Sequence, residues 1–235
     1  MEVKEALTAY GIPWDGESLR RLEIYRAHLK KRNAEMDLTS VPDEDTAERH
    51  FADSLMPLRF PGMIPDTGRA ADVGSGAGFP GLALAVFRPG TEFFLIEAQE
   101  KRCAFLRECA ALMGLSNVKV FHMRAEDAGR DGKLRESFSL TVARALAPMN
   151  VLCEYLSPLT AVGGKCVLWK GAPDERERRD GDFAAGLVGF GNPRDAVLRV
   201  GEAERTLVTY EKLFPTPDRY PRRSGIPSKR PLRAE

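Results

Sequence analysis

The sequence predicts an α/β protein with a Rossmann-like, mostly parallel sheet, an antiparallel edge strand near the C-terminus and a small N-terminal helical cap. Three observations lead to this prediction. Strand-like and helix-like apolar segments alternate from residue 69 onward, a glycine-rich turn follows the first of these strands, and apolar side chains before residue 60 recur at helical spacing.

Residues 1–60 are predicted to form the helical cap. The segment "ESLRRLEIYRAHLKKRN" places Leu19, Leu22, Tyr25 and Leu29 near one face through three- and four-residue steps. A second helix is expected through "DEDTAERHFADSLMPLRF", and the following "PGMIPDTG" has the composition of a turn-rich linker.

Residues 61–215 are predicted to hold the sheet. We expect strands in "RAADVG", "EFFLIEA", "VKVFHMRA", "SLTVARA" and "GKCVLWKG", and helices in "GLALAVFRP", "EKRCAFLRECAALMG" and "PMNVLCEYLSPL". The segment "AVLRVGEAERTLVTYEKL" predicts two strands around a loop, which supply the antiparallel addition. The charged run "PDERERRDGD" is expected to be a solvated loop or a helix end, and residues 216–235 form a basic, proline-rich tail.

Composition narrows the class of protein. With 43% hydrophobic residues, 29% charged residues and a net charge of +1, the chain has an ordinary globular composition and no overall basic field. The N-terminus lacks the apolar run of a signal peptide, no stretch has the length of a bilayer span, and the four cysteines form no CxxC pair. We therefore expect a cytoplasmic protein without a membrane partner.

The turn "DVGSGAGFPG" indicates a nucleotide-containing ligand. Gly76, Gly78 and Gly81 satisfy the dinucleotide pattern G-x-G-x-x-G, whereas Gly74, Gly76 and Gly78 satisfy D-x-G-x-G-x-G. In both patterns glycine lets the backbone approach the ligand closely, and the next helix offers unpaired N–H groups. Both also require an acid at the end of the second strand to bind ribose hydroxyls, and Glu97 is that acid.

Charge favours one of the two ligands. A pyrophosphate would be repelled by a carboxylate beside the glycines, whereas S-adenosylmethionine carries a sulfonium and an ammonium group and no phosphate. Asp72 therefore favours the cationic ligand, with a purely structural hydrogen-bonding role as the alternative. After the third strand we expect Ala125 and Glu126 to contact adenosine and Asp127 to act as a helix cap.

The order of motifs resembles that of the bacterial 16S ribosomal RNA guanine-N7 methyltransferases of the small-subunit methyltransferase G type, the glucose-inhibited division protein B family. The resemblance extends from about Asn33 to Leu232, is vague over residues 173–205, and departs at Asp37, where many members carry asparagine. It is carried by "NAEMDLTSV", "RHFADSL", "DVGSGAGFPG", "EAQEKRCAFLRE", "RAED", "VARALAP", "VLWKG" and "TPDRYPRRSGIPSKRPL".

The resemblance implies a function. Cofactor contact carries over to Gly74, Phe79, Ala125, Glu126 and Arg144, with S-adenosyl-L-methionine as the cofactor. The implied reaction is methyl transfer to N7 of one guanine in the decoding-region loop of 16S ribosomal RNA. The implied partner is 16S ribosomal RNA or the small ribosomal subunit, and the protein is expected to be a monomer.

The remaining chemistry agrees with an N7 acceptor. "VARALAP" stands where amino-group methyltransferases often carry an Asn/Asp-Pro-Pro-aromatic motif, and no cysteine directly follows the fourth strand as a nucleophile. Guanine N7 carries a free lone pair and loses no proton on methylation, so alignment is required and a general base is not. All four cysteines are expected to be small buried hydrophobes.

Three residues are candidates for the reaction itself. Arg144, at the end of the fourth strand, can hold the methionine carboxylate, bond guanine O6 or clamp a phosphate, with a buried structural ion pair as the alternative. Lys170, at the end of the next strand, is expected to meet RNA. His50 and Asp53 share one helical face and either shape the guanine pocket or stabilise the helix. The three histidines lack metal-ligand spacing, so we predict no metal site.

Two basic segments are predicted to bind RNA phosphates. One is the face of the first long helix, with Arg20, Arg21, Arg26, Lys30, Lys31 and Arg32 against Glu23. The other is the tail. Residues 210–235 contain Lys212, Arg219, Arg222, Arg223, Lys229, Arg230 and Arg233 against Glu211, Asp218 and Glu235. The alternative for the tail is a disordered segment that aids solubility.

The sequence offers less support for three other functions. A nicotinamide-dependent reductase would need a catalytic Tyr/Lys or His/Asp pair after the fourth strand, and none is present. A non-catalytic RNA-binding module would not need Asp72, Glu97 and Glu126 around a glycine turn. A methyltransferase for a small molecule or a protein is the nearest alternative, and it would not need the basic tail.

Overall fold

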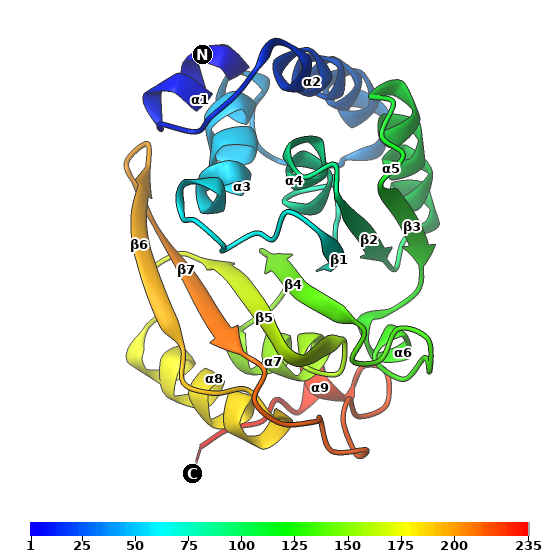
Figure 1. Cartoon of the computed structure of the whole chain (residues 1–235), viewed down its shortest axis with the longest axis vertical. Helices are drawn as coiled ribbons and strands as arrows, with labels where there is room; N and C mark the ends of the chain where they lie inside the picture. Colours follow the sequence, from blue (N-terminus) through cyan, green and yellow to red (C-terminus); the bar gives the residue numbers. More distant parts are fainter. Residues whose placement is uncertain (235) are drawn as a thin grey trace.

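A seven-stranded sheet forms the centre of the protein in the computed structural model, which describes residues 1–234 (Figure 1). The strand order is β3-β2-β1-β4-β5-β7-β6; β1 to β5 pair in parallel, and β7 runs antiparallel to both β5 and β6. The strands are β1 Gly68–Val73, β2 Thr91–Glu97, β3 Val118–His122, β4 Phe138–Arg144, β5 Thr160–Lys170, β6 Arg194–Val200 and β7 Ala203–Glu211. The predicted α/β class is confirmed. The antiparallel strand β7 is not itself the edge strand, because β6 pairs with its outer side.

Helices cover both faces of this sheet. Figure 1 shows α1 to α5 on the side of the N-terminus and α6 to α9 on the side where the chain ends. The first group is α1 Val3–Ala9, α2 Gly16–Met36, α3 Asp53–Leu55, α4 Gly81–Phe87 and α5 Glu100–Leu112. The second group is α6 Ala125–Ala128, α7 Met149–Leu156, α8 Glu175–Val188 and α9 Ile226–Lys229. Among residues 1–234, no helix combines the length and the apolar character needed to cross a membrane.

Alternation along each strand divides the core into two layers. In β2, Phe93 and Leu95 pack with α2, α4 and α5, whereas Phe94 and Ile96 pack with α6 and α7 on the other face. Because helices cover both faces, the strand is apolar throughout instead of alternating with polar residues. That is why "EFFLIEA" reads as a continuous apolar run in the sequence.

The N-terminal helices share a core with the glycine turn. The Tyr25 ring of α2 lies 5.3 Å from that of Phe51 and 5.0 Å from that of Phe79. The predicted first long helix is confirmed by α2. The predicted second helix is a succession of short turns: a 3₁₀ turn Asp43–Asp45, a π-helix Ala47–Ala52, α3 and a 3₁₀ turn Met56–Arg59.

Helix α8 begins where we expected a loop or a helix end. Asp174 caps it by accepting a hydrogen bond of 2.7 Å from the backbone N–H of Glu177. Gly181, within α8, packs closely against α7. A Cβ at this position would lie 2.7 Å from the Met149 Cβ of α7. Of the two expectations for "PDERERRDGD", the helix end is confirmed, because the segment holds the cap and the first turns of α8.

Gly81 provides a similar close approach between α4 and the sheet. A Cβ on Gly81 would lie 2.6 Å from the Asp72 side chain and 2.7 Å from Leu95 Cδ2. Both neighbours belong to central strands and are buried, so neither can move away freely.

We expect Gly81→Ala to lower the free energy of unfolding by about 1–3 kcal/mol, which is the usual range for overpacking. Gly186→Ala in α8 is the matched control because nothing lies within 4 Å of its added Cβ. It should leave stability unchanged or raise it by up to about 1 kcal/mol through helix propensity. Urea unfolding measures both variants, and equal stabilities would contradict the assigned packing of α4.

Candidate active site

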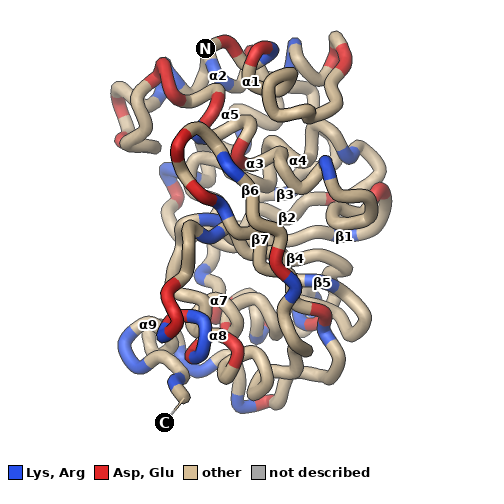
Figure 2. Tube along the Cα trace, turned by 90° about the vertical axis from the view of Figure 1, so that its left-hand side faces the viewer, with Lys and Arg blue, Asp and Glu red and all other residues tan. Residues whose placement is uncertain are grey.

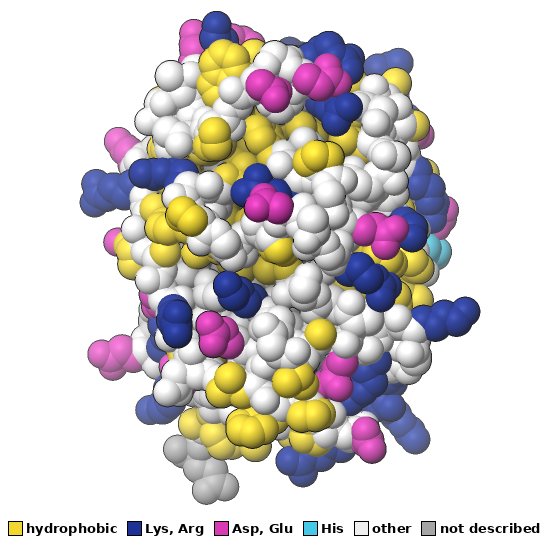
Figure 3. Space-filling model, viewed as in Figure 1, with side chains coloured by type: hydrophobic (Ala, Val, Ile, Leu, Met, Phe, Trp, Pro, Cys, Tyr) yellow, Lys and Arg dark blue, Asp and Glu magenta, His cyan; other side chains and the backbone are white. Residues whose placement is uncertain are grey.

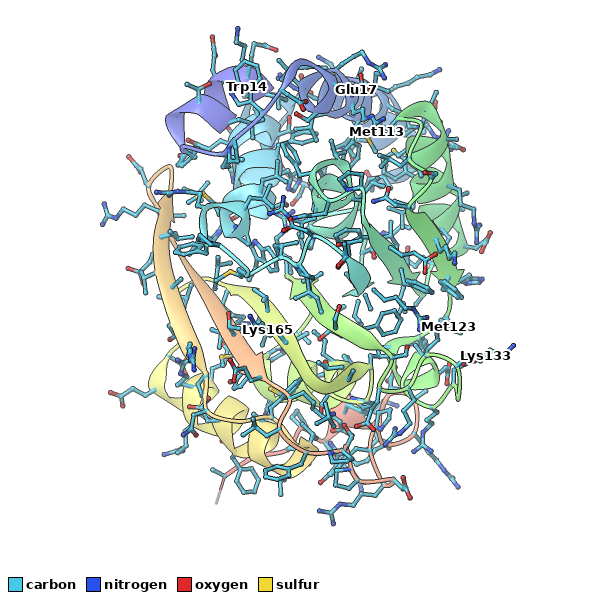
Figure 4. The ribbon with its side chains drawn as sticks, viewed as in Figure 1. Trp14, Glu17, Met113, Met123, Lys133 and Lys165 are labelled. Carbon is cyan, nitrogen blue, oxygen red and sulfur yellow. The ribbon has the colours of Figure 1, made fainter. Side chains whose placement is uncertain are left out.

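A cavity of about 600 Å³ opens at the carboxyl ends of the parallel strands. It lies where the strand order reverses between β1 and β4, the usual ligand position in such sheets. Figure 4 labels Met123, one of its lining residues, just after β3 and beside α6. Of the site residues predicted from sequence, the cavity brings together Gly74, Gly76, Phe79, Glu97, Ala125, Glu126, Arg144 and His50.

The glycine turn forms one wall of this cavity. The φ angles of Gly74, Gly76 and Gly78 are 75°, 56° and 96°, values that residues other than glycine rarely adopt. The Gly74 N–H donates to the Ile96 carbonyl at 2.8 Å, and this bond ties the turn to β2. Gly78 does not line the cavity. It lies against α2, where an added Cβ would overlap the Tyr25 hydroxyl.

Asp72 lies behind the turn and not inside the cavity. Its side chain is 1% exposed, and Oδ2 accepts a 3.0 Å hydrogen bond from the Gly81 N–H at the start of α4. Burial raises the pKa of this carboxyl to about 7. Strand alternation explains the placement: Asp72 shares the face of Ala70, which packs in the α4 layer. The expectation of direct contact with a cationic ligand is corrected accordingly, and the structural alternative describes this residue.

Two other carboxylates do line the cavity. Glu97 Oε2 accepts from the Gly76 N–H at 3.0 Å, and Oε1 accepts from the Gln99 N–H at 2.8 Å. Glu126 Oε1 accepts from the Gly225 N–H at 2.7 Å. Both oxygens of Glu97 keep a second lone pair and Oε2 of Glu126 accepts no hydrogen bond within residues 1–234, so both residues can also accept hydrogen bonds from a ligand.

Arg144 joins β4 to the N-terminal helices. Its Nη1 donates to Asp53 Oδ2 at 2.8 Å and to the Arg49 carbonyl at 3.0 Å, while Nη2 donates to His50 Nδ1 at 2.8 Å. The guanidinium lies over the Phe79 ring, with Cζ of Arg144 5.3 Å from the ring centroid. The ion pair expected as the alternative role of Arg144 is present, with Asp53 as the partner. Arg144 also lines the cavity. Among residues 1–234, its Nε and one N–H of Nη2 have no hydrogen-bond partner.

His50 is held in one neutral form by this arrangement. Burial, together with the charge of Arg144, lowers its pKa from 6.5 to about 3. Because Nδ1 accepts from Arg144, Nε2 carries the proton and donates to Thr39 Oγ1 at 2.7 Å. The ring also stacks on Phe79 with centroids 4.6 Å apart. His50 therefore positions Arg144 and is unsuited to take up a proton near neutral pH.

A second cavity of about 290 Å³ adjoins the first and shares His50, Arg144 and Ala145 with it. Lys170 lines this second cavity and not the first, and its Nζ pairs with Glu177 Oε1 at 2.6 Å. The remaining lining residues are Val41, Arg49, Asp53, Trp169, Gly171 and Arg205.

Arg205 was missed in the sequence. Its Nε donates to Asp53 Oδ1 at 3.0 Å, so Asp53 receives one arginine on each oxygen. Trp169 Nε1 donates to the Asp53 carbonyl at 3.0 Å. The predicted antiparallel strand could have indicated Arg205. Because β7 runs opposite to β5, the first residues of β7 lie beside the carboxyl end of β5, and Thr206 is the strand partner of Lys170.

The cysteines are buried, as predicted. All four are free and have no exposed surface, and burial raises their pKa values, that of Cys166 to about 12. None is available as a thiolate nucleophile. Among residues 1–234, no group of three histidine, cysteine or acidic side chains is arranged to hold a metal ion.

Most cations of the basic face of α2 form ion pairs, some with acids of α2 itself and some with acids from other segments. Arg26 pairs with Glu2 at 2.9 Å and Lys30 pairs with Asp43 at 2.8 Å. Arg20 and Arg21 pair with Glu17, and Arg32 pairs with Glu35 and Glu108. The expectation of a free cationic face is corrected for five of the six cations: Arg20 and Arg21 pair within the helix, Arg26 and Lys30 pair with acids from other segments, and Arg32 pairs with both kinds of acid. Figure 3 accordingly shows basic and acidic side chains interspersed on the face that it displays.

Two of the predicted basic tail residues are also engaged inside the fold. Lys212 is 1% exposed and pairs with Glu136 at 3.1 Å, and burial lowers its pKa to about 8. Arg222 pairs with the buried Glu154 at 2.6 Å. These two cations are not available to RNA.

Comparison with known proteins agrees with this geometry. The family model described as rRNA small subunit methyltransferase G (GidB) matches residues 18–193. The chain belongs to this family. The ribosomal RNA small subunit methyltransferase G of Moorella thermoacetica is 40% identical over 225 residues, which is 94% of this chain and 93% of that protein. The protein of the same name from Carboxydothermus hydrogenoformans is 37% identical, over 98% of this chain and 99% of its own length.

Solved structures share the fold at lower identity. A crystal structure of an MtNAS mutant in complex with S-adenosylmethionine is 14% identical with a TM-score of 0.54, and the match covers 89% of this chain and 77% of that one. TrmN from Thermus thermophilus is 22% identical with a TM-score of 0.51, over 71% and 53% of the two chains. With the family established, the chain is an S-adenosylmethionine-dependent methyltransferase that acts on ribosomal RNA of the small subunit.

The lowered pKa of His50 predicts a pH dependence of stability. Between pH 3 and 6.5 the unfolded chain binds a proton at this histidine that the folded chain does not bind, so stability falls as the pH falls. Between pH 7 and pH 5 the wild type should lose about 2 kcal/mol more than His50→Gln. Urea unfolding at both pH values tests this, with His122→Gln at an exposed histidine as the control. Equal losses in the wild type and His50→Gln would contradict the neutral, buried assignment.

Proposed function

We propose that this methyltransferase transfers a methyl group to N7 of a guanine in the decoding-region loop of 16S ribosomal RNA, with the guanine held in the smaller cavity. The observation that carries the proposal is the pair of adjoining cavities, which meet at His50, Arg144 and Ala145. A cofactor in one cavity and an acceptor base in the other would face each other at Arg144.

The larger cavity fits S-adenosylmethionine in size and chemistry. Its walls combine the bare backbone of the glycine turn with the carboxylates of Glu97 and Glu126, which suit hydroxyl and amine donors and oppose a pyrophosphate. Glu97 would hold the ribose hydroxyls, and Ala125 and Glu126 would contact the adenosine. Gly74, Gly76 and Phe79 would hold the cofactor at the turn, and the free N–H groups of Arg144 would hold its carboxylate. When bound, the cofactor supplies an electrophilic methyl group.

The smaller cavity fits guanine presented by its Hoogsteen edge. That edge carries two acceptors, N7 and O6. Arg205, Lys170 and Arg144 bring donors to this cavity, and Trp169 supplies an aromatic wall. A donor on O6 fixes the base and leaves the N7 lone pair free to attack the methyl carbon. No residue has to remove a proton, because N7 carries none; the role of the chain is to align the two reactants.

The arginine network keeps this alignment rigid. Arg144 is fixed by Asp53, His50 and the Arg49 carbonyl before any ligand arrives. A guanidinium that is already ordered loses little conformational freedom when it binds a ligand. The proposed partner is the small ribosomal subunit or its RNA, and the protein acts as a cytoplasmic monomer. Residues 1–60 serve as the cap that completes the site, 61–215 as the methyltransferase domain and 216–235 as the basic tail.

The test is methyl transfer from labelled S-adenosylmethionine to small ribosomal subunits and to the RNA stripped from them. The labelled RNA is then cleaved with chemistry selective for N7-methylguanosine. One cut in the decoding-region loop of 16S RNA is the expected result. Label that enters the RNA but resists cleavage would overturn the N7 acceptor, and label confined to protein or small molecules would overturn the RNA substrate.

The guanine pocket can be tested separately through Arg205. We expect Arg205→Gln to lower kcat/KM for RNA by about tenfold or more, equivalent to about 1.4 kcal/mol. The dissociation constant of S-adenosylhomocysteine should not change, because Arg205 lines only the smaller cavity. Arg194→Gln, at an exposed position on β6, is the control. Thermal unfolding verifies that each variant is folded. A parallel loss of cofactor affinity in Arg205→Gln would argue against two separate cavities.

A further inference from the structure

The C-terminal residues 216–234, named here the strap, are fixed to the methyltransferase sheet along their length. The Thr216 N–H donates to Glu136 Oε1 at 2.6 Å, and Arg135 donates to the Thr216 and Tyr220 carbonyls at 2.8 and 3.0 Å. Further along, Asn150 donates to the Leu232 carbonyl at 2.6 Å. The strap therefore differs from a disordered tail: α7 and the loop after α6 hold it in place.

Arg222 makes the strongest of these anchors. Its guanidinium and its backbone N–H all donate to Glu154, a fully buried carboxylate of α7, at 2.6 to 3.2 Å. Such a charge-assisted, bidentate pair sets both position and orientation. The backbone on either side of Arg222 is thereby fixed relative to the sheet.

Two strap residues contact the wall of the larger cavity. The Gly225 N–H donates to Glu126 Oε1 at 2.7 Å, and Ser228 Oγ bonds the Tyr155 hydroxyl at 2.8 Å. Glu126 and Tyr155 both line that cavity, and their side chains also contact each other at 3.4 Å. The strap thus forms a second layer behind the residues that face the adenosine.

The outer side of the strap carries cations without acidic partners. Among residues 216–234 there are six cations and one acid, Asp218. Arg222 is the cation used as an anchor. The others are exposed and form no ion pair within residues 1–234: Arg219, Arg223, Lys229, Arg230 and Arg233. Figure 2 shows Lys and Arg segments at the lower end of the molecule, around α8 and α9. This differs from α2, whose cations are mostly paired.

We propose that the strap is a docking surface for RNA phosphates that is coupled to the cofactor cavity, so that bound RNA strengthens cofactor binding through Gly225–Glu126 and Ser228–Tyr155. The inference rests on the proposed RNA substrate. Free cations held on a fixed backbone suit phosphates, which position RNA without reading its sequence. Phosphates bound on the strap stabilise the contacts that Gly225 and Ser228 make with Glu126 and Tyr155, and the coupling is reciprocal by thermodynamic linkage.

The docking part is tested with the triple variant Arg223→Gln, Lys229→Gln and Arg230→Gln in the full chain. Its affinity for unmethylated 16S RNA transcribed in vitro should fall about tenfold or more, with a flatter dependence on salt. S-adenosylhomocysteine affinity without RNA should stay unchanged. The matched control replaces three exposed cations on other surfaces, Lys4→Gln, Arg59→Gln and Arg199→Gln. An equal loss in both triple variants, or an unchanged salt slope, would overturn the strap as the docking surface.

The coupling part is tested by calorimetric titration of S-adenosylhomocysteine with and without saturating RNA. In the wild type, RNA should improve S-adenosylhomocysteine affinity about tenfold, within the usual range of coupling between sites. Ser228→Ala removes the bond to Tyr155 and should reduce this gain, while RNA affinity measured without cofactor stays the same. A merely structural role would change affinity equally with and without RNA. No gain in the wild type, or the full gain in Ser228→Ala, would overturn the coupling.

These binding readouts separate the inference from the proposed reaction. A chain that methylates N7 in 16S RNA but shows no gain in cofactor affinity with RNA contradicts the coupling alone. A chain that shows the gain but leaves N7 unmodified contradicts the acceptor alone. Deletion of the strap is a poorer test, because it would also expose Glu154 and Glu126, which the strap now satisfies.

Discussion

The buried pair of Arg144 and Asp53 is the interaction on which the site depends. It joins the end of β4 to the N-terminal helices at 2.8 Å, and Arg205 of β7 completes it at 3.0 Å from the second oxygen of the same carboxylate. Removing one partner of such a pair is destabilising because it leaves a largely buried charge with fewer compensating contacts. Three distant parts of the chain therefore meet at one carboxylate, and both cavities open beside Arg144.

Burial and strand alternation give two similar carboxylates different roles. Asp72 and Glu97 both accept backbone N–H groups near the glycine turn. Asp72 points into the α4 layer and is withdrawn from any ligand, whereas Glu97 ends its strand at the cavity. The first carboxylate holds α4 against the sheet, and the second both holds the turn and faces the ligand. Proximity to a glycine motif is therefore weaker evidence of ligand contact than position at a strand end.

The sequence alone does not show which lysines and arginines form ion pairs and which stay free. The cations of α2 are mostly paired, with acids of the same helix and of distant segments, while those on the outer side of the strap stay free within residues 1–234. Figure 4 shows one lysine of each kind. Lys165 on β5 is engaged, because it donates to the Gly62 carbonyl. Lys133 lies exposed at the outer surface beyond α6. With a net charge of only +1, attraction of RNA must come from such local groups of unpaired cations.

The sequence by itself determined the α/β class, the strand and helix order and the residues around the glycine turn, because hydrophobic periodicity and glycine conformation are local properties. It also indicated Glu97, Glu126 and Arg144, since strand ends of a parallel sheet meet at one edge. Tertiary structure alone decided that Asp72 is withdrawn, that Arg205 joins Asp53 and that α8 packs against α7 through Gly181. It also decided which cations are free. Each of these features depends on which distant segments face one another. The pattern of residues within one segment does not contain that information.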